Sequence, residues 1–140
     1  VFTFLDRLAS LSAEVVDRGA GRILKFIGDA SFIVYPGEAA DAAVRNLLDL
    51  KDAADELIRS EGFDTHIAVA AHAGEAVIGP FGPEQRLDAF GESVNRAAVA
   101  ERGAQRSAFV ITPEAFRRLE PATRKRFRKY TPPIVYVAKD

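Results

Sequence analysis

A single aspartate at the tip of a short hairpin pattern is the residue whose position most directly suggests chemistry. Residues 22–27 and 30–35 are two runs rich in β-branched and aromatic side chains, separated only by Gly28 and Asp29, which is the spacing of a tight antiparallel hairpin. A carboxylate on such a turn can bind a hard divalent cation such as Mg²⁺, which completes its shell with water and phosphate oxygens. Gly-Asp is also ordinary turn chemistry, so the turn alone leaves a structural role and a metal-ligand role open.

The pattern around this hairpin predicts the elements that must hold it. Apolar residues recur at helical spacing over 2–16 and from about 39 to 60, so we expect an amphipathic helix on each side of the hairpin in the sequence. In the middle of the chain, the sequence predicts a strand over 66–72, a shorter strand over 75–78, a loop to about 87 and a helix from a Ser93 cap to Gly103. In the last third, it predicts a strand over 109–111, a helix start at 112–115, a basic helical stretch over 117–129 and a last strand over 134–138. This order is typical of an α+β fold in which helices pack on one face of a mainly antiparallel sheet.

Length and composition narrow the class of protein. At 140 residues the chain is long enough for one domain with a sizeable core. It contains no Cys, which excludes disulfides, zinc–thiolate clusters and thiol chemistry. The formal charge of −1 gives no overall basic surface for nucleic acid, and no apolar run approaches the roughly 20 residues that span a bilayer. We therefore expect a soluble, intracellular domain with no nucleic-acid or membrane contact.

Three blocks of sequence, taken in order, carry a resemblance to a known family. The blocks are Lys25-Phe26-Ile27-Gly28-Asp29, His72-Ala73-Gly74-Glu75 followed by Val77-Ile78-Gly79, and Leu87-Asp88-Ala89-Phe90-Gly91-Glu92-Ser93-Val94-Asn95. With them, residues 4–112 resemble the catalytic domain of class III nucleotidyl cyclases of the adenylate cyclase type, and residues 132–137 resemble the family's final strand more weakly. The resemblance implies the nucleotide cyclase fold with its ferredoxin-like sheet, and makes residues 1–140 a single catalytic domain.

The resemblance implies an enzyme that converts ATP into 3′,5′-cyclic AMP and pyrophosphate. It implies a cytoplasmic homodimer with active sites at the subunit interface, and Mg²⁺ or Mn²⁺ ions that activate the ribose 3′-hydroxyl. By position, Asp29 corresponds to the second of two metal-binding aspartates, and Asn95 to the helix residue that orients the ribose. Lys25 and Asp88 occupy the two positions that read the purine. A Lys donor for a ring nitrogen and an Asp acceptor for the exocyclic amine suit adenine, whereas guanine calls for the opposite polarity.

Two features depart from the family pattern. The arginine expected four residues after Asn95 is replaced by Val99, and loss of one such transition-state donor costs roughly 10²–10³ in rate. Arg102 lies on the same helix face one turn further along, about 10 Å from Asn95 at helical rise, and is the candidate replacement, whereas Arg96 points elsewhere. The first metal aspartate belongs to a strand ahead of the first helix, and we expect this strand to precede Val1.

Other residues keep a structural interpretation beside the functional one. His72 is more typical of a hydrogen-bonded residue at a strand end than of a general base. Lys125 and Lys129 are candidates for the family's phosphate-binding lysine, but they also fit a solvated basic helix face. Because of Val99, a degenerate cyclase-homology domain that binds nucleotide or only dimerises is the second hypothesis. A ferredoxin-like interaction module unrelated to cyclases would explain the order of elements but not the three blocks.

Overall fold

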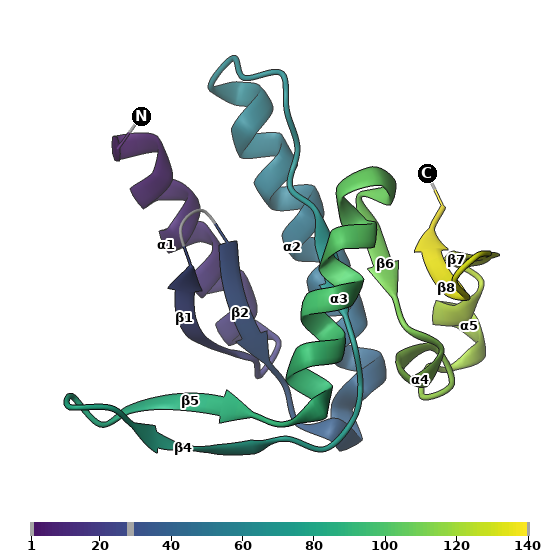
Figure 1. Cartoon of the computed structure of the whole chain (residues 1–140). Coiled ribbons are helices and arrows are strands. Elements are labelled where there is room, and N and C mark those ends of the chain that lie inside the picture. Colours follow the sequence, from purple (N-terminus) through teal and green to yellow (C-terminus); the bar gives the residue numbers. More distant parts are fainter. Residues whose placement is uncertain (1, 28–29, 140) are drawn as a thin grey trace. The chain divides into compact units, whose positions relative to one another are not determined.

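The computed structural model describes residues 2–27 and 30–139, and the side chains of these residues except 103–107. Two compact units make up the chain, residues 1–68 and 69–140 (Figure 1). None of the described helices is long and apolar enough to cross a membrane.

The first unit contains a hairpin that lies between two helices in the sequence. Its elements are α1 (Phe2–Arg18), β1 (Arg22–Ile27), β2 (Ala30–Val34), the 3₁₀ turn η1 (Gly37–Ala39) and α2 (Ala40–Ser60). Val15 and Val16 of α1 are buried, as are most apolar positions of α2 between Ala43 and Ile58. The two helices pack on each other, and α1 also contacts β1. The amphipathic helices therefore support the hairpin that the sequence predicts.

A buried polar network joins the end of α1, the end of the hairpin and α2. Asn46 of α2 donates from Nδ2 to the backbone oxygen of Val15 at 2.9 Å, and its Oδ1 accepts from the Tyr35 hydroxyl at 2.5 Å. Gly19 is required beside this amide, because a Cβ there would lie 2.1 Å from the Asn46 Cγ. Burial raises the pKa of Tyr35 to about 12, so the phenol remains a hydrogen-bond donor at neutral pH.

The segment after α2 is tied back to that helix by side chains. The N–H of Ile67 donates to Asp55 Oδ1 at 2.8 Å, and Lys51 Nζ donates to the Ile67 oxygen at 2.9 Å and to Asp55 Oδ2 at 2.6 Å. Both backbone groups of Ile67 are thus bonded to α2 side chains rather than to a neighbouring strand. The strand predicted over 66–72 is for this reason shorter than expected.

The second unit contains a four-stranded sheet and a separate hairpin. Its elements are β3 (Val69–Ala71), β4 (Val77–Phe81), β5 (Arg86–Phe90), α3 (Glu92–Ser107), β6 (Phe109–Ile111), α4 (Pro113–Phe116), α5 (Pro121–Arg124), β7 (Phe127–Tyr130) and β8 (Val135–Ala138). The sheet order is β3-β6-β8-β7, with β3 and β6 parallel and the other pairs antiparallel. All three residues of the central strand β6 are buried, and α3 packs on β3 and β6.

Several sequence predictions for this unit are wrong in detail. β3 pairs with β6 and not with the next strand in the sequence, whereas strands predicted over 66–72 and 75–78 with only a turn between them are expected to pair with each other. The stretch predicted as a loop to residue 87 forms most of the hairpin β4–β5. Pro80 is tolerated there because a two-stranded ribbon has an outer edge that needs no donor. The basic stretch 117–129, predicted to be helical, contains only the short α5 and then enters β7.

The helix that bears the third block also differs at both ends. α3 begins at Glu92, so Ser93 lies inside its first turn and is not the cap, and the helix continues past Gly103 to Ser107. The other expectations for this unit, the strand at 109–111 and the final strand, agree with β6 and β8. The α+β class with mainly antiparallel pairing is confirmed.

Candidate functional site

Asp88 and Asn95 are carried by consecutive elements of the second unit. Asp88 lies in the middle of β5 opposite Gly79 of β4, is half-buried, and accepts the backbone N–H of the next residue at 2.8 Å. The single residue between β5 and α3 is Gly91, whose φ of +131° is a conformation that glycine adopts without strain. Asn95 follows in the first turn of α3 with an exposed side chain. These two predicted residues thus lie on consecutive elements that are joined by a tight strand-to-helix turn.

The other two predicted positions belong to the hairpin of the first unit. Lys25 lies on β1 opposite Phe32, and its Nζ is 5.8 Å from the centroid of the Phe32 ring, which is a cation–π distance. Asp29 lies outside the described residues. The strands on either side are paired up to Ile27 and Ala30, so the described flanks fit the predicted two-residue turn.

The face of α3 beyond Asn95 carries an apolar side chain where the family pattern has a cation. Val99 is one turn further along and is 59% exposed. Arg102 lies about two turns from Asn95 and is also exposed. Arg96 makes an ion pair with Glu114 at 2.6 Å, in agreement with the expectation that it points elsewhere.

The sequence predicts a metal-binding carboxylate at one place only, the hairpin tip with Asp29. Within residues 2–27 and 30–139, no group of three or more His, Asp or Glu side chains could hold a metal ion. The donor type of Asp29 fits Mg²⁺ or Mn²⁺, because hard cations take one or two carboxylates and otherwise water and phosphate oxygens. This residue therefore remains the predicted ligand.

The hairpin β4–β5 exposes large apolar side chains. Val77, Ile78, Phe81 and Phe90 are 71%, 49%, 60% and 43% exposed, respectively. The rings of Phe81 and Phe90 also pack edge to face, with centroids 5.0 Å apart. Exposed large apolar side chains, grouped on one hairpin as these are, are typical of protein–protein contacts.

The basic C-terminal segment does not form the continuous helix face that the sequence predicts. Lys125 follows α5 directly, and Lys129 lies in β7. Both side chains are exposed. The two candidates for a phosphate-binding lysine therefore come from different elements.

His72 has the structural role that the sequence favours. It follows β3 directly, and its Nδ1 lies 2.8 Å from Oγ1 of Thr112. That hydroxyl also caps α4 by accepting the Ala115 N–H at 3.3 Å. The interpretation of His72 as a hydrogen-bonded residue at a strand end is confirmed.

Sequence reasoning missed a pocket in the second unit that this histidine helps to line. Its other lining residues include Ser93, Arg96 and Glu114, and it contains neither Asp88 nor Asn95. The cap pattern at residues 112–113 predicts the helix start that carries Glu114, but no spacing in the sequence relates that residue to Arg96. The pair arises from tertiary packing between α3 and α4.

Comparison with solved structures identifies the fold. A bacterial light-regulated adenylyl cyclase matches with a TM-score of 0.77 at 22% sequence identity, over 99% of this chain and 44% of that chain. The adenylyl cyclase CyaB from P. aeruginosa matches with a TM-score of 0.75 at 18% identity, over 99% of this chain and 82% of that chain. The fold is that of nucleotide cyclase domains. The sequence matches the family model of the adenylate and guanylate cyclase catalytic domain over residues 1–137, so this chain belongs to that family.

Curated relatives are longer proteins. An adenylate cyclase from Anabaena cylindrica is 25% identical over 111 residues, which cover 72% of this chain and 22% of that protein. An uncharacterised protein from Mycobacterium tuberculosis is 31% identical over 108 residues, which cover 70% of this chain and 19% of that protein. The chain thus spans about a fifth of the length of these relatives.

Proposed function

We propose that this chain is the catalytic domain of an adenylate cyclase, which converts ATP into 3′,5′-cyclic AMP and pyrophosphate. Support comes from the family match over residues 1–137 and from the adenylyl cyclases that share the fold. The two compact units are parts of one catalytic domain in this proposal, because the family match runs through both.

The choice of ATP rests on Lys25 and Asp88. A lysine ammonium can only donate and an ionised carboxylate can only accept hydrogen bonds. Together they match adenine, which offers a ring-nitrogen acceptor beside an amine donor, whereas guanine presents the opposite polarity. The backbone N–H that Asp88 accepts at 2.8 Å helps to orient its carboxylate on β5.

In the proposed mechanism, Asp29 is a ligand of Mg²⁺ or Mn²⁺. When bound, such ions lower the pKa of the ribose 3′-hydroxyl and neutralise charge on the triphosphate. The contribution of the chain in this proposal is to hold the carboxylate, and support comes from the pairing of β1 and β2 up to Ile27 and Ala30, the residues on either side of the predicted turn.

Asn95 and Arg102 are the two residues of α3 to which this proposal assigns contacts with the substrate. Asn95 is exposed in the first turn, where its amide can bind the ribose and hold it for in-line attack. Arg102 is the candidate cation for the charge that develops on the α-phosphate, because Val99 occupies the position where the family has arginine. From two turns away Arg102 is a weaker partner than a residue at position 99, so we expect low turnover.

We further propose that the protein works as a homodimer in the cytoplasm. The exposed apolar residues of β4–β5, Val77 and Phe81 among them, offer a surface that a second copy could cover. An active site at the dimer interface makes catalysis depend on protein concentration.

A test of the adenine assignment uses rates on ATP and GTP with Mn²⁺. Wild-type full-length protein is expected to convert ATP much faster than GTP. Lys25→Glu is expected to lower the ATP rate at least tenfold, because it replaces a donor with an acceptor. Lys139→Glu, which makes the same charge change at an exposed position after β8, serves as the control. Equal loss in both variants would contradict the assignment.

A second candidate function is a degenerate cyclase-homology domain that binds nucleotide or only dimerises. The observation that favours it is Val99, an apolar side chain 59% exposed at the position of the expected catalytic arginine. Under this alternative no cyclic AMP forms, whether ATP binds or the domain only dimerises, so binding and product formation must be measured on the same preparation.

A further inference from the structure

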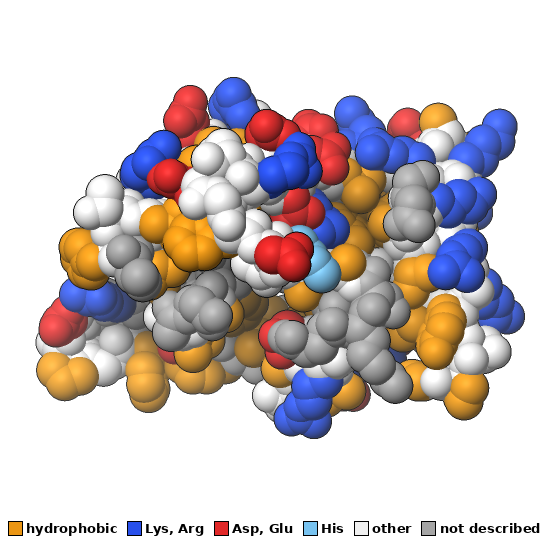
Figure 2. Space-filling view, turned by 90° about the horizontal axis from the view of Figure 1, so that it is seen from above, with side chains coloured by type: hydrophobic (Ala, Val, Ile, Leu, Met, Phe, Trp, Pro, Cys, Tyr) orange, Lys and Arg blue, Asp and Glu red, His pale blue; other side chains and the backbone are white. Residues whose placement is uncertain are grey.

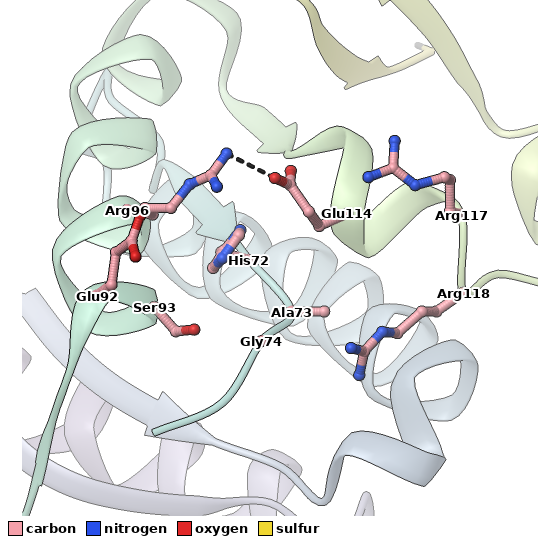
Figure 3. A pocket seen from close by; sticks show the side chains of 9 residues that line it. All are labelled: His72, Ala73, Gly74, Glu92, Ser93, Arg96, Glu114, Arg117 and Arg118. Carbon is pink, nitrogen blue, oxygen red and sulfur yellow. Dashed lines mark ion pairs between the residues drawn. The ribbon is translucent and has the colours of Figure 1, made fainter. Parts of the chain in front are cut away.

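The second unit holds a pocket of about 390 Å³ that the proposed reaction does not use (Figure 3). Three segments supply its side chains: the turn after β3 with His72, the first turns of α3 with Ser93 and Arg96, and α4 with the residues after it, namely Glu114, Arg117 and Arg118. The volume falls in the range of small-molecule sites. All three segments belong to one compact unit.

Part of the pocket wall is fixed by polar contacts. Arg96 of α3 is paired with Glu114 of α4 at 2.6 Å, and His72 is bonded at 2.8 Å to the hydroxyl that caps α4. Gly74 lets the turn after β3 approach α3 closely, because a Cβ there would lie 2.2 Å from the Ser93 Oγ. The wall is therefore preorganised, which lowers the entropic cost of binding.

Two further guanidinium groups line the pocket, those of Arg117 and Arg118, and Arg117 also attracts the Glu114 carboxylate electrostatically. Arg117 and Arg118 are exposed, and neither forms an ion pair with any residue in the described ranges. In Figure 3 the side chain of Arg118 extends toward the turn after β3. Glu114 is already engaged in an ion pair, and Glu92 is the other acidic residue of the lining. Burial lowers the pKa of His72, so that ring is neutral at physiological pH and the lining carries an excess of positive charge.

The part of the second unit around the pocket is also rich in positive charge. Figure 2 shows Lys and Arg side chains gathered at the end of the molecular face where α5, β7 and β8 lie. The segment that follows α4 has seven basic residues between positions 117 and 129: Arg117, Arg118, Arg124, Lys125, Arg126, Arg128 and Lys129. Such a field favours the approach of an anion.

We propose that this pocket binds a small phosphate-bearing metabolite, whose phosphate group is held by Arg117 and Arg118. The guanidinium fork matches phosphate oxygens bidentately, and the Ser93 hydroxyl on the α3 side is a further donor. A phosphate group offers three acceptor oxygens and up to two negative charges, whereas one carboxylate offers two oxygens and one charge. A phosphate is therefore a better match than a carboxylate.

This site is separate from the residues assigned to the cyclase reaction. Ser93 and Arg96 flank Asn95 in the sequence of α3, but Asn95 does not line the pocket. A bound metabolite would contact the same helix that carries Asn95. Binding itself requires no catalysis, so failure of this proposal and failure of the proposed function can be told apart.

Calorimetric titration of the full-length protein with inorganic phosphate tests the proposal. EDTA is included so that no metal-bound phosphate contributes. We expect saturable binding in wild type and a loss of affinity of about tenfold for each arginine removed, in Arg117→Ala and Arg118→Ala. Arg128→Ala removes the same charge from an exposed position of β7 outside the pocket, and is expected to bind like wild type.

Two more arms keep the experiment decisive. The double replacement Arg117→Lys and Arg118→Lys keeps the positive charge but loses the planar guanidinium groups that bind phosphate bidentately, and is expected to bind with intermediate affinity. Acetate, which carries one carboxylate, replaces phosphate in a parallel titration and is expected to bind more weakly. Absence of saturable phosphate binding, equal affinity in the alanine variants and wild type, or tighter binding of acetate would each overturn the proposal, provided circular dichroism shows the variants folded.

Discussion

Replacing Val99 with arginine should raise cyclase activity. The position lies one helical turn after Asn95 on α3, where the family pattern has the arginine that stabilises charge on the α-phosphate. Val99 is 59% exposed, so Val99→Arg removes little buried apolar surface and should change the free energy of unfolding by less than about 1 kcal/mol. The variant therefore tests catalysis with little effect on the fold.

The expected gain follows from the worth of one preorganised donor. Such a donor typically contributes roughly 10²–10³ in turnover, so kcat for cyclic AMP formation should rise by about that factor while KM changes little. If Arg102 now serves in its place, Arg102→Ala should lower the rate in wild type but have little effect once Val99→Arg is present. The assay is cyclic AMP formation from ATP with Mn²⁺.

Ala98→Arg is the matched control. It adds the same side chain at an exposed neighbour, about 100° round the helix from position 99. We expect no gain there. If Val99→Arg folds and binds ATP but its kcat stays within twofold of wild type, or if Ala98→Arg gives the same gain, the role assigned to this helix face is wrong.

Three further predictions concern stability and assembly. Asn46→Ala should lower the free energy of unfolding by about 2 kcal/mol, since it leaves the buried Val15 oxygen and the half-buried Tyr35 hydroxyl without these hydrogen bonds. Asp49→Ala, on the exposed side of α2, should change it little, and urea unfolding checks both. Burial and neighbouring charges place the folded pKa of His72 below its unfolded value of 6.5, so the contribution of this residue to stability is fully present above pH 6.5 and is lost as pH falls through the folded pKa. His72→Gln should therefore weaken the dependence of the urea midpoint on pH below pH 6.5. The same pH dependence in wild type and variant would contradict this. Val77→Ser combined with Phe81→Ser should shift the protein toward monomer in analytical ultracentrifugation and lower activity in parallel; an undisturbed dimer would exclude the β4–β5 surface.

Local patterns predicted much of the fold. The helices α1 and α2 follow from apolar residues at helical spacing, and the β1–β2 hairpin from two β-rich runs around two turn residues. The cap at Thr112 followed by proline predicts the start of α4, and the structure has that cap. In each case the decisive interactions lie within a few residues of one another, so they are visible in the sequence.

The errors lie where long-range contacts decide. Gly79, Pro80, Gly82 and Pro83 resemble a loop, but cross-strand pairing makes a hairpin of the stretch and places Asp88 in the middle of a strand. The basic residues after position 117 have helical propensity, yet pairing with β8 draws residues 127–130 into the sheet. Likewise, the contact of Arg96 with Glu114 depends on how α3 and α4 pack, which no spacing encodes.

The most direct test of the central claim is cyclic AMP formation from ATP by the full-length protein with Mn²⁺. Asp29→Ala serves as the blank, and ATP binding is measured on the same samples. A cyclase gives product in wild type that the variant loses. If ATP binds but wild type forms no cyclic AMP above the Asp29→Ala blank, the protein is not an adenylate cyclase, and the degenerate domain marked by Val99 is the correct description.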